Sequence, residues 1–216
     1  MKLANLHFAL LLAAAGAVRA DPASGDVTYG ATVPSTKIGI SLGLGGGATG
    51  FSASEATDVT SVGETWEVRT TVGTRLPVAG ELAYVGSRRS LGVAGVTGAS
   101  SGETPHLFAH GIEGAARFQF PYVAGSWLLE PFAFVGVGWT HVGVDATVPA
   151  GAPMGTSDDL LVVPFGAGFS GAWHGLVLEG RFTYRSTFSD DLLKNADGSN
   201  VNLANWSVGG LIGYEF

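Results

Sequence analysis

The stretch WSVGGLIGYEF, residues 206–216, places a large apolar side chain at nearly every second position up to the last residue. This alternation has the period of a β-strand, in which successive side chains point to opposite faces. One face carries aromatic residues near both ends and aliphatic residues between them: Trp206, Val208, Ile212, Tyr214 and Phe216. Chain ends of soluble domains are usually frayed and polar. We therefore expect this segment to be the closing strand of a sheet whose apolar face meets lipid.

The same two-residue period continues through most of the chain from residue 36 onward. Each alternating stretch is about 10 to 15 residues long, which suits a tilted strand that crosses a bilayer. Eight stretches are predicted, at 36–47, 65–75, 80–91, 109–120, 128–143, 160–171, 175–187 and 205–216. The predicted fold class is all-β, an eight-stranded antiparallel up-and-down transmembrane β-barrel.

The connections between these stretches alternate strictly in length. Short connections at 76–79, 121–127 and 172–174 alternate with long ones at 48–64, 92–108, 144–159 and 188–204. The long connections are rich in Gly, Ser, Thr, Asn and Asp, and all of them would lie at one end. This arrangement is typical of barrels with short periplasmic turns and long extracellular loops. Both chain ends are therefore expected in the periplasm.

Charged residues within the stretches fall on the face opposite the large apolar side chains. Trp66 and Val68, for example, share one face, while Glu67 and Arg69 share the other. This sorting is expected if the apolar face meets lipid, where a central charge costs roughly 2–4 kcal/mol. The inward face then holds five acidic and five basic residues: Glu67, Arg69, Arg75, Glu81, Glu113, Arg117, Glu130, Glu179, Arg181 and Arg185.

The lumen of an eight-stranded barrel is just wide enough for side chains to fill it, and unpaired charges there are very unfavourable. We expect the ten residues to pair as a polar plug that replaces a hydrophobic core. An ion-pair gate in a narrow channel is the alternative. Arg88 departs from the sorting, because it shares the lipid face with Leu82 and Tyr84. It either meets lipopolysaccharide phosphates at the outer end or is turned inward by a bulge at Ser87.

The N-terminal sequence MKLANLHFALLLAAAGAVRADP has the parts of a secretory signal peptide. Lys2 precedes an apolar run that is too short to span a bilayer. Val18 and Ala20 fit the −3 and −1 positions of a cleavage site before Asp21. The predicted organisation is a signal peptide at 1–20, a periplasmic leader at 21–35 and the barrel at 36–216.

Composition narrows the class of protein further. Charged residues make up 13% of the chain, about half the usual share, and Gly accounts for 34 of 216 residues. The absence of cysteine excludes a disulfide framework and a Cys-ligated zinc site. Removal of residues 1–20 leaves 9 Lys plus Arg against 18 Asp plus Glu, a net charge of −9. Such an acidic chain is not expected to bind nucleic acid.

Three other patterns in the chain suggest different assignments. The segments GGGATG (45–50) and GAGFSG (166–171) match a dinucleotide-binding motif, which requires a following helix, but neither is followed by a helical pattern. The apolar run 160–178 has the length of a membrane helix, but its Pro, its glycines and its alternation favour two strands. His141 lies near the outer rim, where a catalytic site would need a Ser and an acidic partner. The nearby sequence supplies no such group, so no catalytic, cofactor or metal residue is predicted.

These features resemble the small eight-stranded outer-membrane barrels of the OmpA/OmpX/OmpW-type superfamily, and the generic outer membrane protein beta-barrel domain in particular. The resemblance covers about 36–216. In that family the final strand with its terminal Phe is the signal read by the barrel-assembly machinery. This implies the same role for Trp206, Val208, Ile212, Tyr214 and Phe216.

The resemblance implies a monomer in the Gram-negative outer membrane, in contact with lipids that include lipopolysaccharide. The expected function is non-enzymatic, structural or surface-interacting through long acidic loops that carry Asp58, Asp145, Asp158, Asp190, Asp191 and Asp197. A small pore or transporter for small or apolar molecules is one alternative, and a lipid A-modifying enzyme is another. A soluble lipocalin-like barrel would instead place apolar residues inside and charges outside.

Overall fold

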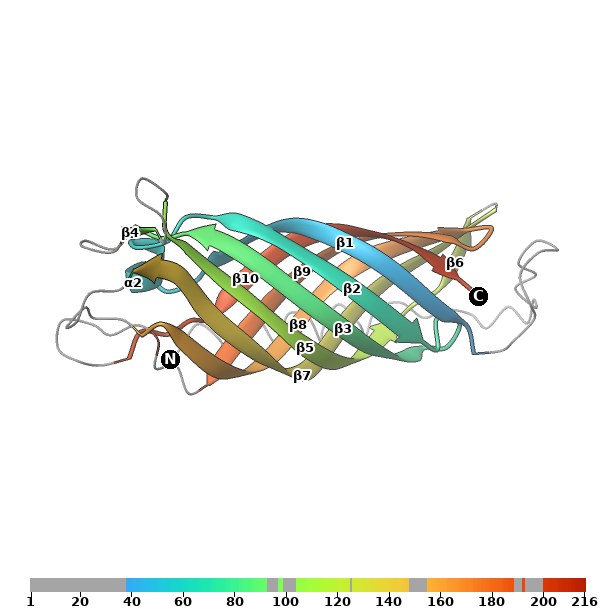
Figure 1. The fold of residues 1–216 in the computed structure, drawn as a ribbon. Helices are drawn as coiled ribbons and strands as arrows, with labels where there is room; N and C mark the ends of the chain where they lie inside the picture. Colours follow the sequence, from blue (N-terminus) through green and yellow to red (C-terminus); the bar gives the residue numbers. More distant parts are fainter. Residues whose placement is uncertain are drawn as a thin grey trace.

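The computed structural model describes residues 38–92, 97–98, 104–124, 126–147, 155–188, 192 and 200–216. The predicted signal peptide, its cleavage site at Val18, Ala20 and Asp21, and the leader at 21–35 lie outside these residues. Eight long strands form a barrel (Figure 1): β1 (Ile40–Phe51), β2 (Gly63–Val72), β3 (Val78–Ser90), β5 (His106–Gln119), β7 (Trp127–Thr147), β8 (Ser157–Trp173), β9 (Leu176–Phe188) and β10 (Asn205–Glu215). Two short strands, β4 (Thr97–Gly98) and β6 (Tyr122–Ala124), pair with β7, and a short helix α2 (Ser54–Thr57) follows β1.

Each long strand pairs antiparallel with the next long strand along the chain. The barrel closes where β1 pairs with β10, from Ser41 opposite Glu215 to Phe51 opposite Asn205. Closure provides hydrogen-bonding partners for both edges of the sheet, as a structure within a bilayer requires. The predicted eight-stranded up-and-down barrel is therefore confirmed, with 206–216 as its closing segment.

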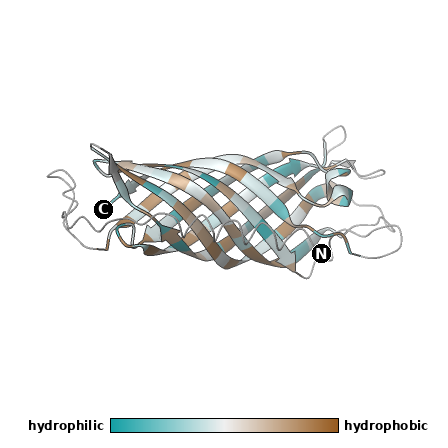
Figure 2. Cartoon of the chain, turned by 180° about the vertical axis from the view of Figure 1, so that it is seen from behind, coloured by the Kyte–Doolittle hydropathy of each residue, from teal (hydrophilic) through white to brown (hydrophobic). Residues whose placement is uncertain are grey.

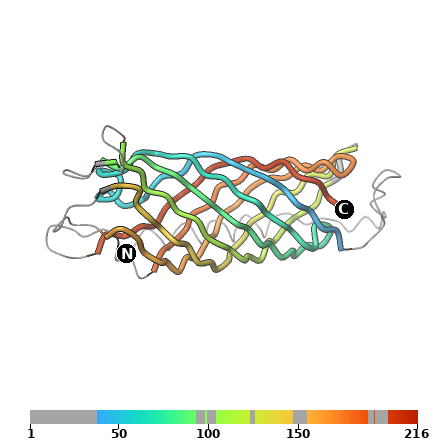
Figure 3. The backbone as a smooth tube through the Cα atoms, in the orientation of Figure 1, coloured from blue at the N-terminus to red at the C-terminus, as the bar shows by residue number. Residues whose placement is uncertain are grey.

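The two ends of the barrel differ, as the tube in Figure 3 shows. At one end lie the tight connections β2–β3, β5–β7 and β8–β9 together with Phe216, whose backbone N–H donates to the carbonyl of Ile40 at 2.8 Å. We call this the turn end. At the other end lie α2, β4 and the strand ends that the four longer connections join, and we call this the loop end.

The first strand begins and ends later than predicted, at 40–51 rather than 36–47. Gly39 bends the chain with a φ of 61° just before the strand, a conformation that favours glycine. The far half of the strand is rich in glycine, so it has few side chains to show the alternation. Its backbone still pairs with both neighbours, and a Cβ at Gly47 would lie 2.1 Å from the carbonyl oxygen of Val208. Residues 48–51, which were expected to begin a long loop, are therefore strand.

Large apolar side chains cover the outside of the barrel. Leu82 is 60% exposed and Val137 65% exposed, and similar residues recur at alternate positions around the wall. Figure 2 shows hydrophobic residues spread along the strands between the two ends. A contiguous apolar surface of this extent marks a surface that is covered by lipid or protein. The apolar side chains lie outside and the charged side chains lie inside, which excludes the soluble lipocalin-like alternative.

The segment 160–178 belongs to two strands, so the membrane-helix alternative is wrong. β8 and β9 are joined by a tight turn at His174 and Gly175, whose φ angles are 50° and 88°. Within the part of the chain that the structure describes, no helix is long and apolar enough to cross a membrane. The glycines of both dinucleotide-like segments lie inside β1 and β8, so neither segment forms a phosphate-binding loop followed by a long helix.

Candidate functional site

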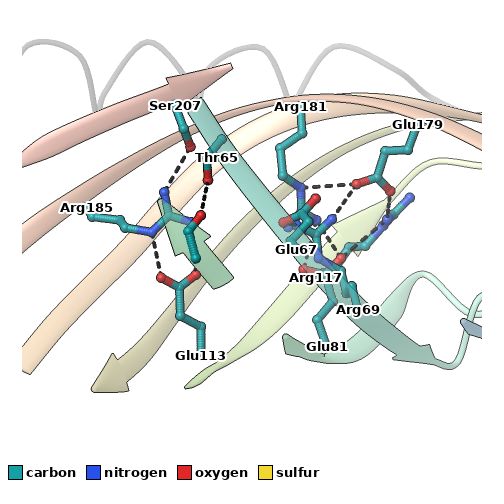
Figure 4. Close-up of polar contacts among 11 residues, drawn as sticks. Thr65, Glu67, Arg69, Glu81, Glu113, Arg117, Glu179, Arg181, Arg185 and Ser207 are labelled. Carbon is teal, nitrogen blue, oxygen red and sulfur yellow. Dashed lines mark hydrogen bonds and ion pairs between the residues drawn. The ribbon is translucent and has the colours of Figure 1, made fainter. Parts of the chain in front are cut away.

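The centre of the lumen is held together by a carboxylate that contacts three arginines from different strands. Glu179 on β9 accepts hydrogen bonds from Arg69 on β2 and Arg117 on β5, both at 2.6 Å. The Nε of Arg181 lies 3.1 Å from the same carboxylate. Figure 4 shows these side chains converging on one another inside the barrel. All are almost completely buried, so their charges are compensated by each other rather than by water.

A second carboxylate, Glu81 on β3, completes this arrangement. It accepts hydrogen bonds from Arg181 at 2.6 and 2.8 Å and from Arg117 at 3.3 Å. Arg69 also pairs with Glu67 on its own strand. Three arginines and three glutamates thus form one balanced cluster, which we call the central network: Glu67, Arg69, Glu81, Arg117, Glu179 and Arg181.

Smaller ion pairs lie on both sides of the central network. Toward the loop end, Arg185 donates to both oxygens of Glu113, at 2.5 and 3.2 Å. Toward the turn end, Arg75 donates to Glu215 at 2.8 Å. Glu130 accepts a hydrogen bond from Ser170 at 3.1 Å. The structure therefore gathers all ten sequence-predicted lumen residues inside the barrel wall.

Two charged lumen residues were missed by the sequence analysis. Glu215 is buried, and the alternation of the strand predicts this, because its neighbours Tyr214 and Phe216 face outward. Arg89 is also buried and points inward from β3. The parity that places Arg88 on the outer face places Arg89 on the inner face, so the alternation was enough to predict it.

Arg88 itself faces outward. β2 and β3 pair without interruption through Thr65 opposite Ser87 and Glu64 opposite Arg88. Ser87 is buried, whereas Arg88 is exposed. The alternative of a bulge at Ser87 is therefore wrong. The Arg88 guanidinium lies 3.3 Å from Nδ1 of His106 on the neighbouring strand.

Aromatic rings also fill the lumen, so the plug is not purely polar. The guanidinium of Arg117 lies 3.6 Å from the ring centre of Phe132, and that of Arg181 lies 4.1 Å from that of Phe134. Such cation–π contacts stabilise a buried guanidinium. The inward glycines of β8 make room for the rings, since a Cβ at Gly168 would lie 2.4 Å from Phe132.

The loop end of the lumen is closed by a hydrophobic cluster that the sequence analysis did not predict. It combines strand ends with residues from α2 and the long connections, and we call it the apolar cap: Phe51, Ala56, Leu91, Leu107, Val142, Leu160, Val162, Leu192, Val201 and Leu203. Between the described residues, the lumen keeps a cavity of about 20 Å³ on the turn-end side and one of about 40 Å³ beneath the cap. Spaces of this size hold a few water molecules at most.

A row of polar residues crosses the outer face near the loop end. The strand register aligns His110 on β5, His141 on β7 and Asp159 on β8. Nδ1 of His141 lies 2.8 Å from the Asp159 carboxylate, and the two imidazole rings are 5.4 Å apart. Cross-strand pairing thus supplies the acidic partner that the nearby sequence does not. No serine hydroxyl is hydrogen-bonded to His141, and no three metal-binding side chains cluster, among the residues that the structure describes.

The fold and this interior together define a small eight-stranded β-barrel of the outer-membrane type. The predicted resemblance to such barrels is confirmed for the fold. The structure is similar to that of Neisserial surface protein A, with a TM-score of 0.49 and 12% identity over 84% of this chain and 98% of that chain. It is also similar to a major outer membrane protein from Thermus thermophilus, with a TM-score of 0.48 and 11% identity over 83% of this chain and 99% of that chain.

The N-terminal β-barrel domain of Pseudomonas aeruginosa OprF gives a TM-score of 0.44 and 11% identity over 82% of this chain and 97% of that chain. No protein-family model and no curated protein sequence matches the chain. At these identities the similarities concern the arrangement of the strands and do not extend to a ligand or an activity.

Proposed function

We propose that this chain is a non-enzymatic integral protein of the Gram-negative outer membrane. Its role would be structural, or would depend on the molecules that bind to its loop end. The observation that carries the proposal is the closed lumen. The central network and the apolar cap block it at two levels, while the outer wall is apolar. A barrel that is filled in this way has a structural or surface-binding role rather than a transport role.

The proposed orientation places the turn end and both chain termini in the periplasm. It rests on the rule that outer-membrane barrels have short periplasmic turns and long extracellular loops. The loop end would then face the medium with an acidic surface. Asp58, Asp145 and Asp158 belong to this end, while Asp190, Asp191 and Asp197 lie outside the described residues.

Single-channel recording in planar bilayers tests the closed lumen. The wild-type protein should give no current above the lipid baseline, whereas a known porin added to the same bilayer should conduct. Steady unitary currents from the purified monomer would refute the proposal and favour the small pore or transporter.

Outer-membrane lipids, including lipopolysaccharide, are the proposed partners of the outer wall. Arg88 supports this proposal because it is an exposed cation at the loop end, near the outward Trp66, which lies opposite Gly86 on the same pair of strands. Aromatic rings are typical of the membrane interface, and a cation there can pair with a lipid phosphate. The Arg88→Gln variant should copurify with less lipopolysaccharide than wild type, and Arg75→Gln, at the opposite end, should not. Equal amounts in all three proteins would contradict a role for Arg88.

The barrel-assembly machinery is the proposed partner during biogenesis. The outward row on β10 supports this, because Val208, Ile212, Tyr214 and Phe216 all project from the wall at the edge where the barrel closes. Their exposure leaves these side chains accessible to a partner before closure. The protein is proposed to remain a monomer after assembly, because the closed sheet has no open edge to share.

Lipid modification is the second candidate, and the His141–Asp159 pair is the observation that favours testing it. A histidine oriented by a carboxylate can act as a general base if a nucleophile is within reach. If the protein is not an enzyme, cells that overproduce the wild type and cells that overproduce His141→Ala should give the same lipid A mass spectrum. A new lipid A species that requires His141 would overturn it.

A further inference from the structure

Arg89 is a buried cation whose surroundings contain donors and aromatic surface. It is 4% exposed and lies just beneath the apolar cap. Its Nη2 donates to Thr49 at 2.6 Å, and its guanidinium carbon lies 4.2 Å from the ring centre of Phe51. Among the described residues, its Nε has no hydrogen-bond partner.

Among the residues that the structure describes, no carboxylate that lines the cavity next to Arg89 is free to neutralise this charge. The nearest acidic residue of this half of the lumen, Glu113, is engaged through both oxygens by Arg185, which also donates to Ser207. Arg185 is positively charged and repels Arg89. In the part of the chain that the structure describes, Arg89 forms no ion pair. An unpaired buried charge is strongly unfavourable, so a counterion is expected.

The cavity of about 40 Å³ beneath the cap adjoins this guanidinium. Both arginines line it, together with Glu113 and with hydroxyl groups that can donate hydrogen bonds, such as those of Ser87 and Thr140. Its remaining wall is largely apolar, with Phe51 among the lining residues. This volume holds roughly two or three water-sized particles. A donor-rich, net positive space of this size suits one monatomic anion and is too small for a lipid headgroup or a sugar.

We propose that the cavity binds a single halide ion, chloride under physiological conditions, as the counterion of Arg89. The ion would receive hydrogen bonds from the guanidinium and from neighbouring hydroxyls, and it would lie between the apolar cap and the Arg185–Glu113 pair. Binding would couple the stability of the loop end to the halide concentration. The site is independent of the proposed surface function.

Bromide provides a direct probe, because it can replace chloride and has a measurable anomalous signal. Crystals of the detergent-purified full chain grown in sodium bromide should show one anomalous peak within hydrogen-bonding distance of the Arg89 guanidinium. Arg88→Gln removes the adjacent outward arginine and should keep the peak, whereas Arg89→Met should lose it. A cavity that holds only water in the wild type, or a peak that persists in Arg89→Met, would overturn the proposal.

Unfolding by urea tests the site in solution at constant ionic strength. Replacing sodium gluconate by sodium chloride should raise the urea midpoint of the wild type and of Arg88→Gln, because a ligand that binds the folded state stabilises it. Arg89→Met should show no chloride-dependent shift and, in gluconate, should be at least as stable as wild type. A wild-type midpoint that does not change between the two salts would refute the site even if bromide appears in crystals.

Discussion

The substitution Glu179→Gln probes the central network most sharply. The glutamine keeps the shape of the side chain but removes the negative charge that three arginines share. It also turns an NH₂ group toward guanidinium donors that need an acceptor. The cluster then carries three arginines against two glutamates, an imbalance of one buried positive charge.

The expected loss of stability follows from the contacts that survive. Breaking a buried ion pair by removing one partner costs about 3–5 kcal/mol. Here each arginine keeps another partner, since Arg69 retains Glu67 while Arg117 and Arg181 retain Glu81. The loss should therefore lie at the lower end of the range, about 3 kcal/mol.

Urea unfolding of the refolded barrel in detergent micelles measures this loss, followed by tryptophan fluorescence and by gel migration without heating. Glu64→Gln is the matched control, because it removes the same charge from an exposed outward position and should change stability by less than about 0.5 kcal/mol. The double variant Arg117→Met with Glu179→Met restores the charge balance and should be less destabilised than Glu179→Gln. If Glu179→Gln unfolds at the same urea concentration as Glu64→Gln, the network does not stabilise the lumen.

Two further substitutions and one deletion test other parts of the structure. Leu107→Ala removes a side chain that is 1% exposed in the apolar cap and should lower the unfolding free energy by about 2–5 kcal/mol; an unchanged urea midpoint would mean that the cap does not pack as described. Gly168→Val should sharply lower the refolding yield, because a Cβ there would lie 2.4 Å from the carbonyl of Gly180, whereas Gly180→Val should be tolerated because nothing lies within 4 Å of its Cβ position. Similar yields would contradict the close approach. Deletion of Phe216 should reduce the amount of protein in the outer membrane of cells while detergent refolding stays near normal; equal losses in both assays would indicate a packing role instead of an assembly role.

The strands and the faces of the barrel were predictable because a two-residue period survives wherever side chains are large. The predicted bounds of the first strand, 36–47, lie four residues before the observed ones, because the glycine-rich end of the strand offers few side chains that show the period. The backbone of this strand pairs nonetheless, because sheet hydrogen bonds need no side chain. The end of such a strand is therefore defined by its pairing with β2 and β10.

Parts of the interior depend on register, which a single sequence does not provide. His141 and Asp159 are 18 residues apart, and only the pairing of β7 with β8 brings them together. The apolar cap draws Val201 and Leu203 from a long connection, where no periodicity marks a buried position. Charge parity, by contrast, depends only on which face of a strand is apolar, and it indicated ten of the charged lumen residues while Arg89 and Glu215 were missed.

The most direct test of the account is the environment of successive positions along β3 in a lipid bilayer. The chain contains no cysteine, so single-cysteine variants at Leu82, Ala83, Tyr84 and Val85 can carry one spin label each. Labels at Leu82 and Tyr84, which face lipid, should show high collision rates with oxygen and low rates with a water-soluble nickel complex. Labels at Ala83 and Val85, which face the lumen, should be shielded from both. Reversed parity, or nickel accessibility along the whole strand, would contradict a membrane-spanning barrel with a filled interior.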